Sequence, residues 1–80
     1  MRVSLNGVLR SAADGLASIE IEADNIRDLL SRLLDRYPAM AEHMDLGIAV
    51  AVDGVIYRDD WTRQIPPGAE VFLMPRIAGG

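Results

Sequence analysis

The sequence has 80 residues, half of them hydrophobic and a quarter charged, which is typical of a single folded domain with a modest core. It contains no cysteine, which excludes disulfide bonds, thiolate metal sites and a cysteine nucleophile. All eight basic side chains are arginine and the formal net charge is −4, which argues against a nucleic-acid-binding protein and favours a partner with a basic surface.

The first quarter of the chain predicts an antiparallel hairpin. Apolar and polar residues alternate over residues 1–5 and again over residues 17–23, which is the period of a half-buried strand. Between these runs, an Asn-Gly pair at Asn6 is a turn signal, although the chain could also continue as an interrupted strand through Arg10. An Asp-Gly pair at Asp14 is a second turn signal before the return strand.

The next segment changes to the period of a helix. Apolar side chains recur at alternating intervals of three and one from Ile26 to Tyr37, which places them on one stripe of an amphipathic helix. Asn25 is a suitable N-cap, and Asp28 stands where the partner residue of a capping box is found. Pro38 ends the helix because a proline disfavours helical angles in the residue before it.

The second half of the chain predicts a hairpin and a final strand. Residues 48–57 form two apolar runs around an Asp-Gly turn at Asp53, a strong hairpin signal. The segment before it, residues 38–47, is a connection with room for a single helical turn. Residues 70–74 form the last strand, and we expect Pro75 to end its ladder because proline supplies no N–H.

This order of elements predicts an α+β domain in which a mixed sheet of four to five strands wraps one main helix. The pattern alone places a helix on a mixed sheet, and the β-grasp (ubiquitin-like) topology depends on the resemblance described below. We expect residues 1–75 to form the domain and residues 76–80 to form a flexible C-terminal tail. No apolar run approaches the roughly 20 residues of a membrane helix and no secretory signal is present, so we expect a cytoplasmic protein without a membrane partner.

Few side chains could support catalysis. His43 is the only histidine, and a lone histidine in a connection is more often a surface or capping residue than a metal ligand. The serines lie in no nucleophile motif, and no glycine-rich phosphate loop is present. The adjacent carboxylates of Asp59 and Asp60 are more typical of a solvated bend than of an acid–base pair. The sequence therefore predicts a protein that is not an enzyme and holds no metal and no stably bound cofactor.

The C-terminus is the most distinctive feature. The chain ends in Gly79 and Gly80, the thinnest peptide available, and such an end can enter a channel that would exclude any side chain. Ala78 continues this slim profile. The terminal carboxylate is ionised at pH 7 and unhindered, so it is a competent oxygen nucleophile and, once activated, a reactive acyl group. The alternative is a terminus that is merely frayed.

The last strand predicts a surface next to this end. If its alternate residues pack on the helix, then Phe72 and Met74 lie on the outer face of the sheet, beside Ala49 and Ala51 of the preceding hairpin. An apolar outer face next to a flexible tail is a candidate for partner docking. The alternative is that Trp61 lies over Phe72 and covers this face locally.

These features together resemble the MoaD/ThiS family of ubiquitin-like sulfur carriers, and most of all the small subunit of molybdopterin synthase. The resemblance covers the whole chain, although "IPPGAEV" and "MPRIAGG" replace the acidic turn and the double proline that members usually show. It is carried by "LR" at residues 9–10, "ADG" at 13–15, "IRDLLSRLLDRYP" at 26–38, "AVDG" at 51–54, "IPPGAEVFLMP" at 65–75 and the terminal "AGG".

The resemblance implies a mechanism that uses the tail. A separate adenylating enzyme binds the carrier and consumes ATP, and the Gly80 carboxylate attacks the α-phosphorus to give an acyl-adenylate. Sulfur from a persulfide donor then displaces AMP and leaves a C-terminal thiocarboxylate. Gly79 and Gly80 form the reactive end.

The family also implies partner contacts around this end. Phe72 and Met74 belong to the docking surface, Arg10 and Arg76 lie at its rim, and Ala78 enters the partner with the tail. In molybdopterin synthase that partner is a large catalytic subunit.

The final acceptor stays open at the level of sequence. The length favours the molybdopterin type over the shorter thiamine carriers, with thiamine thiazole or cysteine biosynthesis as alternatives. Two alternatives come from other functional classes. One is a ubiquitin-like modifier that is joined to other proteins through Gly80, and the other is a β-grasp interaction module whose tail has no function.

Overall fold

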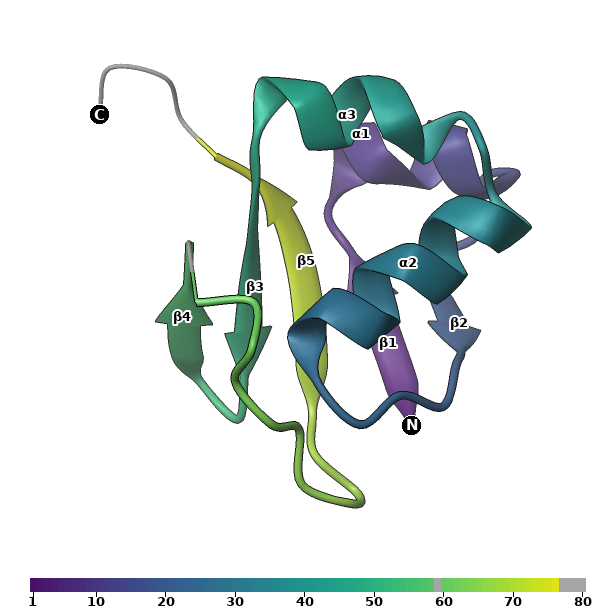
Figure 1. The fold of residues 1–80 in the computed structure, drawn as a ribbon. Coiled ribbons are helices and arrows are strands. Elements are labelled where there is room, and N and C mark those ends of the chain that lie inside the picture. Colours follow the sequence, from purple (N-terminus) through teal and green to yellow (C-terminus); the bar gives the residue numbers. More distant parts are fainter. Residues whose placement is uncertain (59, 77–80) are drawn as a thin grey trace.

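The computed structural model describes residues 1–58 and 60–76 and shows a single sheet with helices on one face and at one end (Figure 1). The strands are arranged in the order β2-β1-β5-β3-β4, with β1 and β5 parallel and the other neighbours antiparallel. The elements are β1 (Arg2–Leu5), α1 (Gly7–Arg10), the 3₁₀ turn η1 (Ser11–Ala13), β2 (Ser18–Glu20), α2 (Ile26–Arg36), α3 (Met40–Leu46), β3 (Ile48–Val52), β4 (Val55–Tyr57) and β5 (Val71–Pro75).

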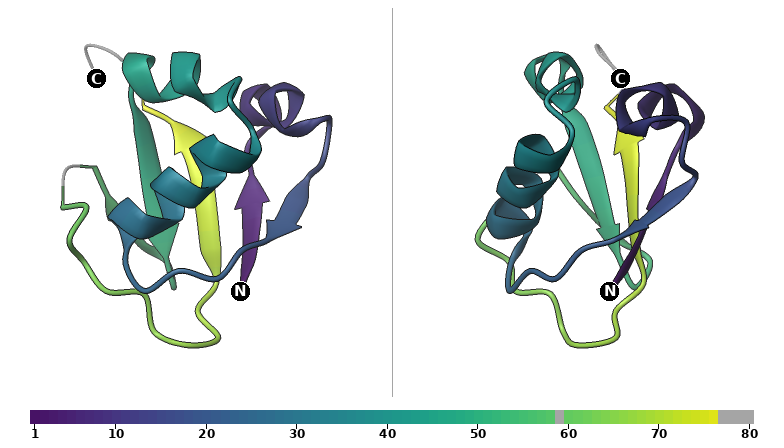
Figure 2. Two further views of the ribbon diagram at one scale, coloured as in Figure 1. Left: turned by 45° about the vertical axis from the view of Figure 1, so that its right-hand side comes forward. Right: turned by 90° about the vertical axis from the view of Figure 1, so that its right-hand side faces the viewer.

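The core lies between α2 and the sheet, as predicted. The helix stripe of Ile26, Leu29 and Leu33 is fully buried, and it faces the equally buried Val50 of β3 and Leu73 of β5. Two turned views show α2 across one face and α1 and α3 at the end from which the chain leaves β5 (Figure 2). The predicted α+β fold, a mixed sheet around one main helix in the β-grasp arrangement, is confirmed.

The start of α2 follows the predicted capping pattern. The Oδ1 of Asn25 accepts a hydrogen bond of 2.7 Å from the backbone N–H of Asp28. The Asp28 carboxylate in turn accepts from the backbone N–H of Asp24 at 3.3 Å, one residue before the cap, and pairs with Nε of Arg32 at 3.0 Å. The helix therefore begins where the sequence places it.

The connection between β1 and β2 is helical, so both predictions for it, a turn at Asn6 and an interrupted strand through Arg10, are wrong. The Asn6 side chain accepts from the backbone N–H of Gly7 at 2.6 Å and starts α1. The helical turn is favoured because it buries Leu9 completely in the core. The second turn signal is confirmed, since Asp14 adopts left-handed angles with φ of 56°.

Two further differences concern the segments around β3. Residues 40–46 form the two-turn helix α3, where the sequence predicts at most a single turn, because burial of Met40 holds it against the core. β5 also includes Pro75, which lies opposite Ile48. The backbone N–H of Arg76 donates to the Gly47 carbonyl at 3.0 Å, so the missing proline donor points away from β3, toward the side where β1 has already ended at Leu5.

The α-ammonium group of Met1 pairs with carboxylates at the end of β2 and just after it. This contact predicts that the stability of the fold depends on pH. The ammonium donates to the Glu22 carboxylate at 2.7 Å, and this hydrogen bond raises the pKa of the ammonium above its ordinary 8.0 and lowers the pKa of Glu22 below its ordinary 4.5. The ammonium contribution is complete below pH 8 and is lost as pH rises through the raised pKa; the carboxylate contribution is complete above pH 4.5 and is lost as pH falls through the lowered pKa.

We therefore expect Glu22→Gln to lower the thermal midpoint only slightly between these limits, because the Glu22 carboxylate is 88% exposed and water screens the pair. The difference between the variant and the unchanged chain should shrink as pH rises through the raised pKa of the ammonium, and also as pH falls through the lowered pKa of Glu22. Thermal denaturation followed by circular dichroism across this range measures it, and a difference that is independent of pH would contradict the role given to the pair.

Candidate docking surface beside the C-terminal end

The centre of the sheet leads directly to the C-terminal end. β5 is the middle strand, and the chain leaves it at Arg76, which is the last residue that the structure describes. Ala78, Gly79 and Gly80, for which the sequence predicts the slim and reactive end, lie outside the described residues. The site can therefore be built from the surfaces that surround the end of β5.

The outer face of the sheet carries one row of side chains across four strands. The register places Phe72 of β5 opposite Ser4 of β1 on one side and Ala51 of β3 on the other, and Ala51 lies opposite Ile56 of β4. Directly opposite residues in a sheet share a face. Phe72 and Ile56 keep 40% and 52% of their surface exposed, and because they lie in one row they form a continuous apolar patch rather than isolated exposed residues.

We call Phe72, Met74, Ala51 and Ile56 the docking face. Met74 lies next along β5 on the same side as Phe72 and is half-buried. A shallow hollow of about 230 Å³ opens beside Phe72 on this face, and Ser4, Ala51, Gly54, Glu70, Val71 and Phe72 line it. The small side chain of Ala51 leaves the room for this hollow, so the face could receive an apolar side chain of another protein.

Ile56 belongs to this face although the sequence analysis did not single it out. The signal was present, because a two-residue hairpin turn fixes the pairing of the strands that it joins. Asp53 and Gly54 both adopt positive φ, at 50° and 86°, so Val52 pairs with Val55 and Ile56 follows opposite Ala51. The prediction of Phe72, Met74 and Ala51 on the outer face is confirmed by the same register.

One expectation about this face needs correction, and the alternative in which Trp61 covers it is excluded. Ala49 lies opposite Met74 on the outer side, but it retains only 4% of its surface and is not available for contact. Trp61 does not cover Phe72: it packs against the main core on the α2 side, where it shares a hollow with Leu30. The backbone explains this position, because the Trp61 carbonyl accepts from the N–H of Arg27 in the first turn of α2 at 2.8 Å.

The two arginines predicted at the rim flank the end of β5 on opposite sides. Nε of Arg10 donates to the Leu5 carbonyl at 3.2 Å, which holds this side chain at the end of β1. Arg76 bonds through its backbone to Gly47, beside the start of β3, and its side chain lies against the Gly47 backbone. The structure therefore places Arg10 beside the end of β1 and Arg76 beside the start of β3, on different sides of the end of β5.

Other kinds of site find no support among residues 1–58 and 60–76. No group of three or more His, Asp or Glu side chains in this part of the chain is arranged to hold a metal ion. None of the helices described there is both long and apolar enough to cross a lipid bilayer. His43 lies half-buried in α3, where its carbonyl accepts from the N–H of Gly47.

Comparison with protein families and curated sequences gives one match. The model of the ThiS family matches residues 3–80, which is nearly the whole chain and includes the terminal Gly-Gly pair. No curated protein sequence matches the chain significantly.

Solved structures share the fold at low sequence identity. A chain of the BexX/CysO complex of Amycolatopsis orientalis superposes with a TM-score of 0.79 at 19% identity, over 99% of this chain and 98% of that one. A putative molybdopterin converting factor subunit 1 from Pyrococcus furiosus gives 0.79 at 23% identity, with coverage of 95% of each chain. The small archaeal modifier protein SAMP1 of Methanosarcina acetivorans gives 0.79 at 22% identity, over 99% of this chain and 94% of that one.

Proposed function

Because the chain belongs to the ThiS family, a group of small ubiquitin-like sulfur carriers, we propose that it carries sulfur as a thiocarboxylate on Gly80. The observation that carries this proposal is that the family match extends through residue 80, so that it includes the Gly-Gly end as well as the fold. We further propose molybdopterin biosynthesis as the pathway, which the likeness to the P. furiosus protein supports.

The proposed chemistry proceeds in three steps on the terminal carboxylate. An oxygen of Gly80 attacks the α-phosphorus of ATP in a partner enzyme, pyrophosphate leaves, and an acyl-adenylate forms. The terminal sulfur of a persulfide on a donor protein attacks the acyl carbon, and AMP leaves. A second thiol then cleaves the resulting acyl disulfide and releases the thiocarboxylate. The chain itself provides only the carboxylate, since it has no cysteine and no lysine that could take part.

The docking face fits this division of work. Its exposed Phe72 and Ile56 lie on the strands around the root of the tail, so a partner that packs on them also receives the chain end. The partners that we propose are an adenylating enzyme, a persulfide donor and the large catalytic subunit of a molybdopterin synthase. A complex between the two solved chains of A. orientalis, BexX and CysO, is a precedent for a partner of a similar small protein.

The direct test is an intact-mass measurement. The purified chain is incubated with ATP, the adenylating enzyme of its source organism and a persulfide donor. We expect the mass to rise by the difference between one sulfur and one oxygen, and we expect no rise when ATP is omitted. The control is that the same enzyme preparation loads sulfur onto another carrier protein. If it does so and the mass of this chain stays unchanged, the proposal is overturned.

A protein modifier is the second candidate, and the likeness to SAMP1 favours it. In that case Gly80 forms amide bonds to amines of other proteins, and higher-mass conjugates appear on a gel. Because the chain has no lysine, its own side chains cannot extend such conjugates into polymers. Conjugates without sulfur exchange would select the modifier; sulfur exchange without conjugates would select the carrier.

A further inference from the structure

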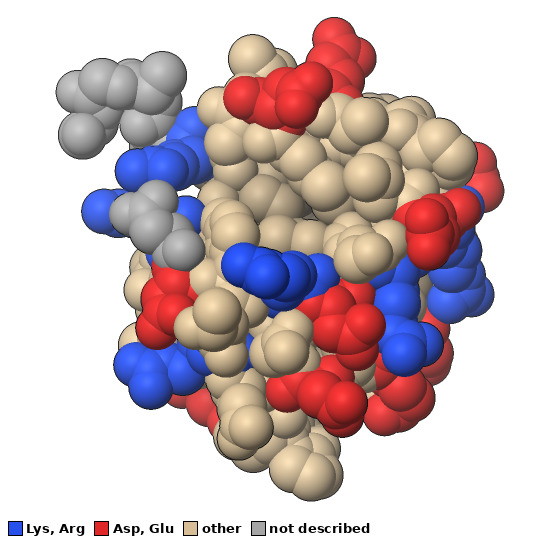
Figure 3. Space-filling view, in the orientation of Figure 1, with Lys and Arg blue, Asp and Glu red and all other residues tan. Residues whose placement is uncertain are grey.

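A second hollow opens on the α2 side of the sheet, close to the root of the tail. It has a volume of about 350 Å³ and lies at the corner where α3 ends and β3 begins. In the space-filling view, side chains other than Lys, Arg, Asp and Glu fill the hollowed area below α3, and basic side chains lie beside it (Figure 3). Its lining consists of Leu30, Met44, Gly47, Ile48, Arg58, Trp61 and Arg76.

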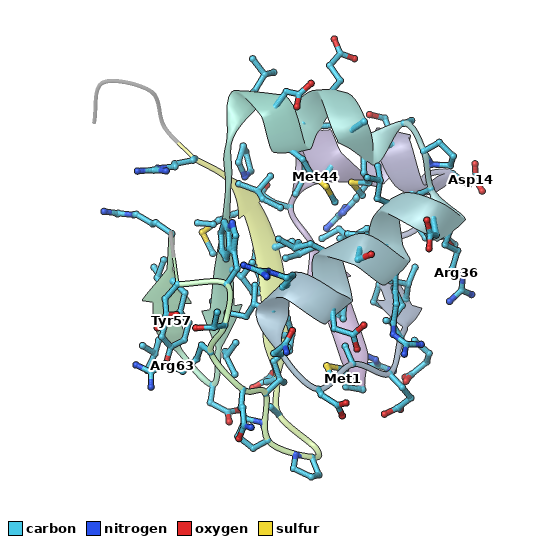
Figure 4. The ribbon with its side chains drawn as sticks, in the orientation of Figure 1. Met1, Asp14, Arg36, Met44, Tyr57 and Arg63 are labelled. Atoms are coloured by element: carbon cyan, nitrogen blue, oxygen red, sulfur yellow. The ribbon has the colours of Figure 1, made fainter. Side chains whose placement is uncertain are left out.

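The walls of this hollow include apolar side chains that the core buries only in part. Leu30, Met44 and Trp61 are half-buried, because each packs against the core on one side and faces the hollow on the other. Met44 lies on the underside of α3, toward α2 (Figure 4). A half-buried methionine beside a half-buried tryptophan adapts readily to an inserted apolar side chain.

The charge of the hollow is opposite to that of the molecule. The chain carries a net charge of −4, yet two arginines, Arg58 and Arg76, line the hollow, and no aspartate or glutamate is among its described lining residues. Both arginine side chains are exposed at its edge. A guanidinium pair around an apolar depression is complementary to a peptide that carries carboxylates next to an apolar side chain.

Covalent geometry connects this hollow with the tail. Four residues separate Arg76 from the end of the chain, and four residues span at most about 14 Å when fully extended. Any protein that acts on the Gly80 carboxylate must therefore come within that distance of Arg76. The docking face on one side of β5 and the hollow on the other are the two surfaces next to this point of the chain.

We propose that this hollow is a second docking site, and that it binds an acidic segment with one apolar anchor on the enzyme that adenylates Gly80. The inference rests on the proposed function for the identity of this partner. The partner then holds the carrier from both faces of the sheet, which fixes the direction of the tail more firmly than contact with one flat face. The apolar anchor enters between Met44 and Trp61, and the carboxylates pair with Arg58 and Arg76.

The only tryptophan of the chain provides a direct reporter, because Trp61 lines the hollow. The chain labelled with 5-fluorotryptophan gives a single ¹⁹F resonance, and it is titrated with the purified adenylating enzyme of the source organism without ATP. We expect the resonance to shift on binding. We also expect Arg58→Glu to weaken binding by about tenfold at low salt, and by less as salt screens the charges.

Arg36→Glu is the matched control, because it makes the same charge change at the end of α2, away from the hollow and from the C-terminal end (Figure 4). It should change binding less than about threefold. The thermal midpoint of each variant checks that the fold is kept. A resonance that does not move, an enzyme that does not bind, or an Arg58→Glu chain that binds as well as the control would each overturn the second site.

The proposed function and this inference fail in different ways. If sulfur is loaded but the Trp61 resonance does not respond, the carrier stands and the second site falls. If the resonance shifts and Arg58→Glu binds weakly but no sulfur is loaded, the second site stands and the carrier chemistry falls.

Discussion

Removal of Gly80 is expected to lower the rate of sulfur loading at least about 100-fold while leaving the fold intact. The shortened chain still ends in a glycine carboxylate, but this carboxylate lies about 3.5 Å nearer to the end of β5. A nucleophile held even 1 Å from its attacking position can react about 100-fold more slowly, so one missing residue takes the carboxylate oxygen out of reach of the α-phosphorus. Intact-mass measurement of the loaded fraction over time gives the rate.

Addition of one glycine after Gly80 is the matched variant, since it displaces the carboxylate by the same length in the opposite direction. Neither change touches the buried core, whose members lie between Val3 and Leu73, so both thermal midpoints should stay within about a degree of the unchanged chain. Loading of the shortened chain at a rate within threefold of the full one would show that Gly80 is not the reactive residue.

The elements that the sequence predicted well are those in which local pattern and burial agree. The α2 stripe, the Asn25 cap and the Asp53 hairpin each have one favourable solution, because the periodicity, the capping group and the turn residues indicate the same structure. The outer position of Phe72 follows from alternation once the buried position of Leu73 is known.

The prediction for residues 6–10 was wrong because local signals are weak there and tertiary packing decides. Asn-Gly favours a hairpin turn in isolation, but the same asparagine also caps a helix, and only the burial of Leu9 and Ala13 selects the helical form. Trp61 is similar. Its position depends on a hydrogen bond to Arg27, 34 positions earlier in the chain, and no periodicity in the sequence reports it.

The candidate site was predictable to different degrees. The Gly-Gly end and its chemistry follow from the residues themselves, whereas the hollow beside Arg76 requires α2, α3 and the segment after β4 to meet, and sequence spacing does not reveal this. Ile56 lies between these cases, since the turn at Asp53 already determined its face.

Replacement of Phe72 by alanine is expected to weaken binding to the adenylating enzyme by about 30-fold, which corresponds to the loss of one aromatic hot-spot residue. Phe72 stands at the centre of the docking face, between Ser4 and Ala51, and fills no part of the main core. The loss should be nearly independent of salt because the contact is apolar, unlike the loss caused by Arg58→Glu. Isothermal titration at two salt concentrations separates the two contributions.

Val55→Ala is the control, because Val55 is 53% exposed yet pairs with Val52 and therefore belongs to the opposite face of the sheet. It should change binding less than about threefold, while both alanine variants should keep thermal midpoints within about 5 °C of the unchanged chain. If Val55→Ala weakens binding as much as Phe72→Ala does, the partner does not bind specifically to the outer face of the sheet. If neither variant affects binding, the enzyme recognises the carrier through the tail and the hollow, and the outer face serves another partner.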